Sequence, residues 1–204
     1  MKIFLRVMGM VLLLGHWYCN AQIPGEKTLI IVIDPGHGGR DSGAVGVKGV
    51  MEKDVVLKAA RNLIKGQCKF DGREAHFYLT RYSDTLISLG DRCRLAKSLN
   101  ADLFISLHCN DSPDSTANGV EVYVCNQENP FLKQSIWISY LLEKKIAEHT
   151  NQISRGVKFA NFQVLRDLKF ECPAILIELG FLSNVNGPDY LNIFEALLEK
   201  SLLD

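Results

Sequence analysis

The chain has 204 residues, of which 47% are apolar, and its 23 basic residues are balanced by 23 acidic ones. This length and composition fit a single domain with a substantial core. The lack of a basic excess argues against electrostatic binding to nucleic acid, so no nucleic-acid partner is expected.

Residues 1–21 have the features of a secretory signal peptide. Lys2 and Arg6 give a basic start, Val7–Leu14 is a short apolar run, and Cys19–Ala21 ends in a small residue suited to cleavage. The apolar run is too short to span a bilayer as a permanent helix. The alternative of a lipid anchor on Cys19 is weaker, because bulky residues precede it.

We therefore expect an exported protein, periplasmic or extracellular, with no stable membrane anchor and with its folded domain over residues 28–204. Removing residues 1–21 leaves a formal charge of about −2.

Apolar periodicity then predicts alternating strands and helices along the chain. In order, these are a strand at Leu29–Ile33, a helix at Glu52–Gln67, a strand at Ala75–Arg81, a helix at Asp91–Leu99, strands at Leu103–His108 and Val120–Cys125, a helix at Phe131–His149, short and longer strands at Phe162–Leu165 and Ala174–Leu179, and a helix at Tyr190–Leu203. Asn100 occupies the position of a left-handed helix cap. The alternation predicts an α/β fold, with a single domain built on a mixed or mostly parallel twisted sheet with helices on both faces.

The cysteines that follow the signal peptide give no metal-binding pattern. They are Cys68, Cys93, Cys109, Cys125 and Cys172. None lies in a Cys-x-x-Cys pair, which argues against a zinc ribbon, and an odd number cannot pair completely within one chain. We interpret them as small apolar residues in and around the core.

Three predicted strands end on residues that can bind a metal or move a proton. Ile30–Ile33 runs into the turn that carries His37, Leu103–Leu107 runs into His108, and Ala174–Ile177 runs into Glu178. In an open α/β sheet, ligands bind beyond the carboxyl ends of the strands. Two histidines and carboxylates gathered at that edge make a zinc site the leading hypothesis.

Each of these residues also has a structural explanation. The glycine-rich turn around His37 does not match a dinucleotide fingerprint, because the sixth position counted from Gly36 is Asp41. A lone strand histidine such as His108 is more often a satisfied structural residue than a metal ligand. Glu178 is harder to explain structurally, because it places a charge where a buried strand should continue.

Glu52 supports two interpretations. It precedes Val56, Ala59 and Leu63 at helical spacing, which puts it on the face turned toward the core. A buried carboxylate without a partner is costly. The alternative is a solvent-exposed glutamate in the first turn, favoured there by the helix dipole, and for Glu52 taken alone it is the interpretation that we prefer.

The chain also resembles a known family, the zinc-dependent N-acetylmuramoyl-L-alanine amidases of the amidase 3 type. The segments that carry the resemblance are Ile33–Gly39, Glu52–Asp54, Leu79–Arg81, Leu103–Asn110, Arg155–Lys158, Val164–Arg166 and Pro173–Asn184. They follow the family's order and extend over most of the chain beyond residue 28.

The resemblance implies a function and a set of roles. His37, Glu52 and His108 would bind one zinc ion per chain, and Glu178 would be the catalytic carboxylate. The implied reaction is hydrolysis of the amide between N-acetylmuramic acid and L-alanine in peptidoglycan. A zinc-bound water would be the nucleophile and Glu178 the general base.

Four matching polar residues are candidates for contacting the peptide, namely Asn110, Arg155, Lys158 and Arg166. Arg166 has the alternative role of bracing its own loop. The interval between His108 and Glu178 leaves no room for the extra helix that plugs the site in some family members. We therefore expect activity without an activator, and we also expect a monomer. The alternatives are a zinc peptidase or deacetylase acting on another amide, and a non-catalytic cell-wall binding protein.

Overall fold

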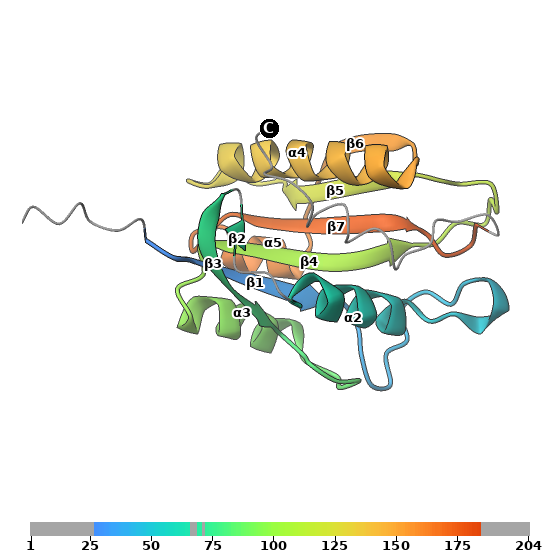
Figure 1. Ribbon diagram of the computed structural model, residues 1–204, viewed down its shortest axis with the longest axis horizontal. Helices are drawn as coiled ribbons and strands as arrows, with labels where there is room; N and C mark the ends of the chain where they lie inside the picture. Colours follow the sequence, from blue (N-terminus) through green and yellow to red (C-terminus); the bar gives the residue numbers. More distant parts are fainter. Residues whose placement is uncertain (1–26, 66–68, 71, 185–204) are drawn as a thin grey trace, which may run out of the picture.

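The fold is built on one seven-stranded sheet (Figure 1). It is described by a computed structural model over residues 27–65, 69–70 and 72–184. The strands are β1 (Leu29–Pro35), β2 (Lys69–Phe70), β3 (Arg73–Leu79), β4 (Leu103–Asn110), β5 (Val120–Cys125), β6 (Ser154–Ala160) and β7 (Ala174–Phe181). Their order in the sheet is β2-β3-β1-β4-β7-β5-β6. Only the β2–β3 and β5–β7 pairs are antiparallel, so the sheet is mixed and mostly parallel, as the sequence predicts.

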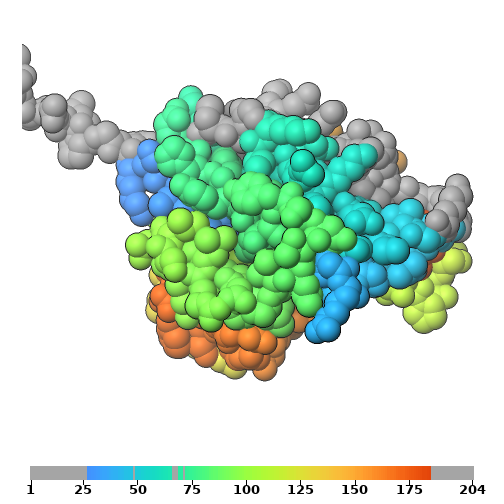
Figure 2. Space-filling model, turned by 90° about the horizontal axis from the view of Figure 1, so that it is seen from below, coloured from blue at the N-terminus to red at the C-terminus, as the bar shows by residue number. Residues whose placement is uncertain are grey.

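Helices cover both faces of this sheet. On one face lie α2 (Glu52–Leu63) and α4 (Leu132–Thr150), which share a core with Ile31 and Ile33 of β1. On the other lie α3 (Leu89–Ser98) and α5 (Gln163–Leu168), which pack around Val32 and Phe104. Figure 2 views the molecule from the side of α3, whose green surface lies against the orange segment that includes α5. The central strands are therefore mostly apolar on both faces, as expected of parallel strands between two helical layers.

The start of α2 is fixed to the loop that precedes it. The backbone N–H of Glu52 donates to the carbonyl of Ala44 at 2.9 Å, and that of Lys53 donates to the carbonyl of Ser42 at 3.1 Å. These bonds satisfy two of the N–H groups that a helix leaves unpaired at its first turn. They also hold residues 42–44 against the helix, and this fixes the position of Glu52 relative to that loop.

One predicted element is wrong. Phe162–Leu165, predicted as a strand, contains the helix cap and the first turn of α5, and the strand in this region is β6. β6 is an edge strand that pairs only with β5 among the described strands. Because β6 lies at the edge of the sheet and contains Gly156 at φ 79°, its sequence lacks the apolar alternation by which strands are recognised.

Other expectations have mixed outcomes. Asn100 has the predicted left-handed conformation, with φ 50°. Cys93, Cys109, Cys125 and Cys172 are free and buried, as expected. The predicted signal peptide, Cys68 and the helix at 190–203 lie outside the described residues. Among the helices that the structure describes, none is both long and apolar enough to cross a membrane.

Candidate metal centre

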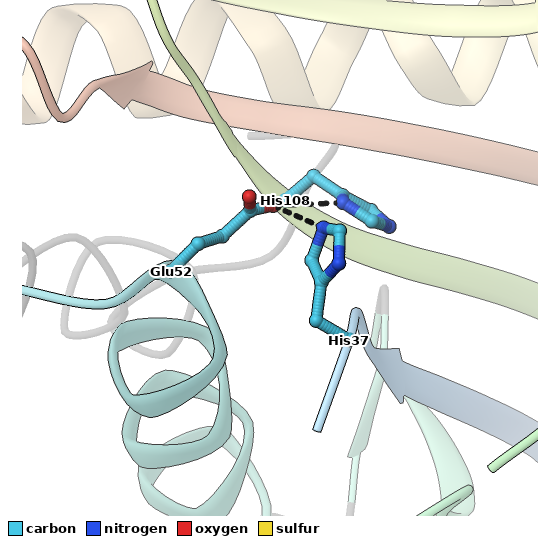
Figure 3. A group of neighbouring side chains, drawn as sticks. All are labelled: His37, Glu52 and His108. Atoms are coloured by element: carbon cyan, nitrogen blue, oxygen red, sulfur yellow. Dashed lines mark hydrogen bonds and ion pairs between the residues drawn. The ribbon is translucent and has the colours of Figure 1, made fainter. Parts of the chain in front are cut away.

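His37, Glu52 and His108 converge at the carboxyl ends of β1 and β4 (Figure 3). The Oε1 atom of Glu52 lies 3.1 Å from Nε2 of His37 and 2.8 Å from Nδ1 of His108. One potential ligand atom from each residue lies within 4.8 Å of the other two. The two imidazole rings meet edge to face, with centroids 4.9 Å apart. Three segments far apart in the sequence thus place three possible metal ligands in one group.

Glu52 is buried, and its carboxylate is fully engaged. Oε2 accepts a hydrogen bond from the backbone N–H of Ala44, and Oε1 accepts one from that of Cys109. Burial would raise the pKa of Glu52, but the hydrogen bonds with His108 and His37 outweigh it and hold the pKa well below its ordinary value. The inward-facing interpretation of Glu52 is therefore the one that the structure bears out.

The partners of His37 are acidic on both sides of its ring. Nε2 faces Glu52, and Nδ1 lies 2.9 Å from Oδ2 of Asp41. The contact with Glu52 is the largest of the effects that raise the pKa of His37 to about 8. A carboxylate on the second ring nitrogen of a histidine is a common arrangement around protein-bound metals, because it fixes the ring and makes it a better ligand. Asp41 was not predicted from the sequence as a partner of His37.

Two glycines make room for the cluster. A Cβ atom on Gly36 would lie 2.3 Å from Cε1 of His108. A Cβ atom on Gly43 would lie 2.4 Å from Oε2 of Glu52 and 2.6 Å from Cδ2 of His37. Any other residue at either position would push the imidazoles or the carboxylate aside. The glycine-rich turn is thus explained by the side chains packed against it.

Two buried arginines hold the turn that carries His37, which itself has the unusual φ of 58°. Arg92 pairs with Asp34 at 2.6 Å and donates to the carbonyl of His37 at 2.7 Å. Arg81 donates to the carbonyls of Pro35 at 3.0 Å and Gly36 at 2.8 Å. The carbonyl groups of the turn therefore accept hydrogen bonds from buried arginines rather than from water. These bonds fix the conformation of the turn.

Glu178 lies beside the cluster without joining it. It is in register with His108 on β4 and with Glu121 on β5. Its Oε2 atom is buried and has no hydrogen-bond partner among the described residues. Burial is the main cause of its raised pKa, which is about 7. An unpartnered carboxylate oxygen next to a group of possible metal ligands is well placed to accept a proton from a molecule bound there.

Three of the four predicted peptide-contacting residues meet on Glu121, a residue that was not predicted from the sequence. Oε1 of Glu121 accepts from Nδ2 of Asn110 at 2.8 Å, and Oε2 accepts from Nε of Arg155 at 2.9 Å and from the ammonium of Lys158. The hydroxyl of Tyr123 also donates to Oε1. In the sequence, Glu121 alternates with apolar residues like an ordinary solvent-facing residue, so nothing there signals its burial.

The fourth residue, Arg166, lies elsewhere. Its contacts are Asp167 at 3.4 Å and the carbonyl of Asn161 at 3.5 Å, both next to or within its own helix, α5. The structure thus does not bring Arg166 to Glu121, and its contacts fit the alternative role of bracing its own segment.

The donor set fits a zinc ion. With metal–ligand bonds of 2.0–2.1 Å and tetrahedral angles, ligand atoms around zinc are about 3.3 Å apart. The distances from Glu52 Oε1 to the two imidazole nitrogens, 3.1 and 2.8 Å, are close to this spacing. Two histidines and one glutamate are the ligands of several hydrolytic zinc sites, which leave one position for water.

Comparison with known proteins gives a consistent result. The sequence profile of a family described as N-acetylmuramoyl-L-alanine amidase matches residues 31–195. The probable cell wall amidase LytH of Staphylococcus epidermidis is 36% identical over 201 residues, which cover 92% of this chain and 63% of LytH. The N-acetylmuramoyl-L-alanine amidase LytC of Bacillus subtilis is 36% identical over 161 residues, or 79% of this chain and 31% of LytC. This chain therefore spans less than two thirds of these relatives.

A solved structure agrees with this result. The crystal structure of an N-acetylmuramoyl-L-alanine amidase from Clostridium difficile 630 superposes with a TM-score of 0.72 at 30% identity. The match covers 84% of this chain and 94% of that one.

Gly43→Ala should weaken zinc binding at least tenfold, because the added methyl group would displace Glu52 and His37. Gly49→Ala is the matched control: Gly49 also has a positive φ, 75°, but nothing lies within 4 Å of the place that its added methyl group would take. Both substitutions incur backbone strain of about 1–2 kcal/mol. Competition titration with a chromophoric zinc chelator measures the affinity. Equal zinc affinity in the two variants would contradict the role of Gly43 in making room for the ligands.

Glu121→Gln should remove part of the acid sensitivity of folding. Burial would raise the pKa of Glu121, but hydrogen bonds from Lys158 and Arg155 lower it from 4.5 to about 2. Its ionised form therefore stabilises the folded state fully above pH 4.5, and this contribution, on the order of 2 kcal/mol, is lost as pH falls toward 2. Urea unfolding at pH 7, 4 and 3 should show a smaller pH effect in Glu121→Gln than in wild type. Glu148→Gln, at an exposed position, should behave as wild type, and a full wild-type pH effect in Glu121→Gln would count against this role.

Proposed function

The chain belongs to the N-acetylmuramoyl-L-alanine amidase family, and on this premise we propose that it is a zinc-dependent hydrolase of peptidoglycan. The bond cleaved is the amide between N-acetylmuramic acid and the L-alanine of the peptide stem. The family match supports the choice of substrate, and so do the names of the two relatives, a probable cell wall amidase and an N-acetylmuramoyl-L-alanine amidase. The site residues alone would serve the hydrolysis of other amides equally well.

The observation that carries the proposal is the combination of two neighbouring groups. His37, Glu52 and His108 offer three ligands to a metal, and Glu178 offers an unpartnered carboxylate oxygen next to them. When bound, zinc supplies a Lewis acid and lowers the pKa of a coordinated water from 15.7 toward ~7. The three residues would hold the ion and leave a position open for the water.

Glu178 then moves the proton. As an ionised carboxylate it takes a proton from the attacking water, and as a carboxylic acid it gives that proton to the departing amine of L-alanine. A pKa near the operating pH suits both steps, because neither direction of transfer is then strongly unfavourable. Oε2 has no hydrogen-bond partner among the described residues, so it is free to accept this proton.

The setting of this activity follows from the N-terminal segment. Residues 1–21 act as a secretory signal peptide, and the catalytic domain over residues 28–204 works in the cell envelope, in the periplasm or outside the cell. The domain acts as a monomer without an obligatory activator.

The proposed activity is tested by digestion of purified peptidoglycan with the protein lacking residues 1–21. Mass spectrometry should detect intact stem peptides with a free L-alanine amine. A zinc chelator should abolish their release, and added zinc should restore it. Zinc-dependent products with another free amine would overturn the choice of bond, and release that is unaffected by chelation would overturn the metal mechanism.

Glu178→Gln should retain zinc and lower kcat by a factor of roughly 10²–10⁴, because the amide cannot accept the proton of water. Zinc content by atomic emission and turnover on a soluble muropeptide give the two readings. Glu148→Gln, on the exposed end of α4, provides a glutamate control that should keep wild-type turnover. Wild-type kcat in Glu178→Gln would show that another group transfers the proton.

A further inference from the structure

Arg155 and Lys158 retain hydrogen-bond donors after binding Glu121. Arg155 uses Nε on Glu121 and Nη1 on the carbonyl of Asn118 at 3.4 Å, while its Nη2 has no acceptor among the described residues. Lys158 contacts Oε2 of Glu121, and the two remaining N–H groups of its ammonium are free of acceptors in the same part of the chain. Both side chains are 37% exposed. The pair therefore presents unused N–H groups toward solvent.

The guanidinium of Arg155 is held firmly. Its Cζ atom lies 5.0 Å from the centre of the Phe181 ring, in cation–π geometry. A Cβ on Gly119 would lie 2.8 Å from Cγ and Cδ of Arg155, so the absence of a side chain there makes room for it. A side chain that is already ordered loses little further entropy when it binds a ligand.

The backbone around Arg155 is anchored as well. The buried carboxylate of Glu143, on α4, accepts from the hydroxyl of Ser154 at 3.0 Å and from the N–H of Gly156 at 3.1 Å. These two residues flank Arg155 on either side. The buried Glu143 thus fixes the backbone at the bulged start of β6. The direction in which the Arg155 side chain extends from this backbone is fixed with it.

This pair lies a short distance from Glu178. Glu178 on β7 is directly opposite Glu121 on β5, and Glu121 bonds Arg155 on β6, the next strand. Neighbouring strands are ~4.8 Å apart, so the guanidinium is one to two strand spacings, about 5–10 Å, from Glu178. An extended peptide advances ~3.3–3.6 Å per residue. The distance corresponds to about two or three residues.

We propose that Arg155 and Lys158 bind a carboxylate of the peptide, on the second or third residue beyond the scissile amide. Glu121 is a positioning residue that holds the two cations. This inference rests on the proposed function and narrows the expected set of peptide contacts. Asn110 gives its amide to Glu121, and Arg166 stays on its own helix, so neither belongs to the carboxylate site.

The test measures binding rather than turnover, using the zinc-loaded protein without residues 1–21. Titration calorimetry compares product peptides that begin with a free L-alanine, carry an amidated C-terminus and differ only in one side chain. That side chain is a carboxylate or its carboxamide at residue two, three or six. We expect the carboxylate to improve Kd about tenfold at residue two or three and to have no effect at residue six.

Arg155→Gln and Lys158→Gln should each abolish most of this preference, while the exposed Arg61→Gln, on α2, should retain it. The two variants are independent, so one that fails to fold leaves the other to decide. Arg155→Lys keeps the positive charge but loses Nη2. It should therefore retain only part of the preference for the carboxylate peptide over its carboxamide. Equal Kd values for acid and amide in wild type, or an unchanged preference in both variants, would overturn the carboxylate site.

Failure of the proposed function gives a different result. A protein that releases no free L-alanine amine from peptidoglycan, yet prefers the acidic peptide in an Arg155-dependent manner, would retain the carboxylate site and lose the amidase activity. A protein that cleaves the amide but binds acidic and amidated peptides alike would retain the activity and lose the carboxylate site.

Discussion

The sharing of one glutamate carboxylate between two imidazoles is the interaction on which the candidate site depends. Glu52 comes from the first turn of a helix, and the two histidines lie at the carboxyl ends of two neighbouring strands. Its negative charge is buried, so the arrangement is favourable only with positive charge close by. A protonated histidine supplies that charge without a metal, and a divalent cation would supply it with one. The same electrostatic requirement thus accounts for the hydrogen bonds and for the fit of zinc.

The turn that carries His37 depends on a second buried charge pair. Arg92 and Asp34 are almost fully buried, and Thr80 and Ser106 complete the hydrogen bonding of the aspartate. Removing two charges from water is costly, and the pair alone need not stabilise the fold. Its arginine also donates to the carbonyls of Pro35 and His37. These bonds hold the backbone of His37 in its left-handed conformation. A side chain that binds a metal needs such a fixed backbone.

The sequence was sufficient for the architecture and for part of the site. Buried parallel strands are recognisable as apolar runs, and the edge where they end is where His37 and His108 lie. Residues whose role depends on contacts across the sheet were not predictable. Glu121 alternates with apolar residues as a solvent-facing one would, and only the strand pairing shows that it is buried under two cations. β6 escaped recognition for a related reason, since an edge strand that carries Arg155 and Lys158 lacks an apolar pattern.

The position of β7 has a consequence for how the protein is made. It is the last strand of the described chain, yet it lies in the middle of the sheet between β4 and β5. Until it is added, β2, β3, β1 and β4 have no strand to connect them with β5 and β6, and Glu178 is missing from the site. A chain that emerges from the ribosome with its amino end first cannot complete this sheet early. The residues of the candidate site come together only after nearly the whole described chain is available, so the site cannot form while the chain is still being synthesised.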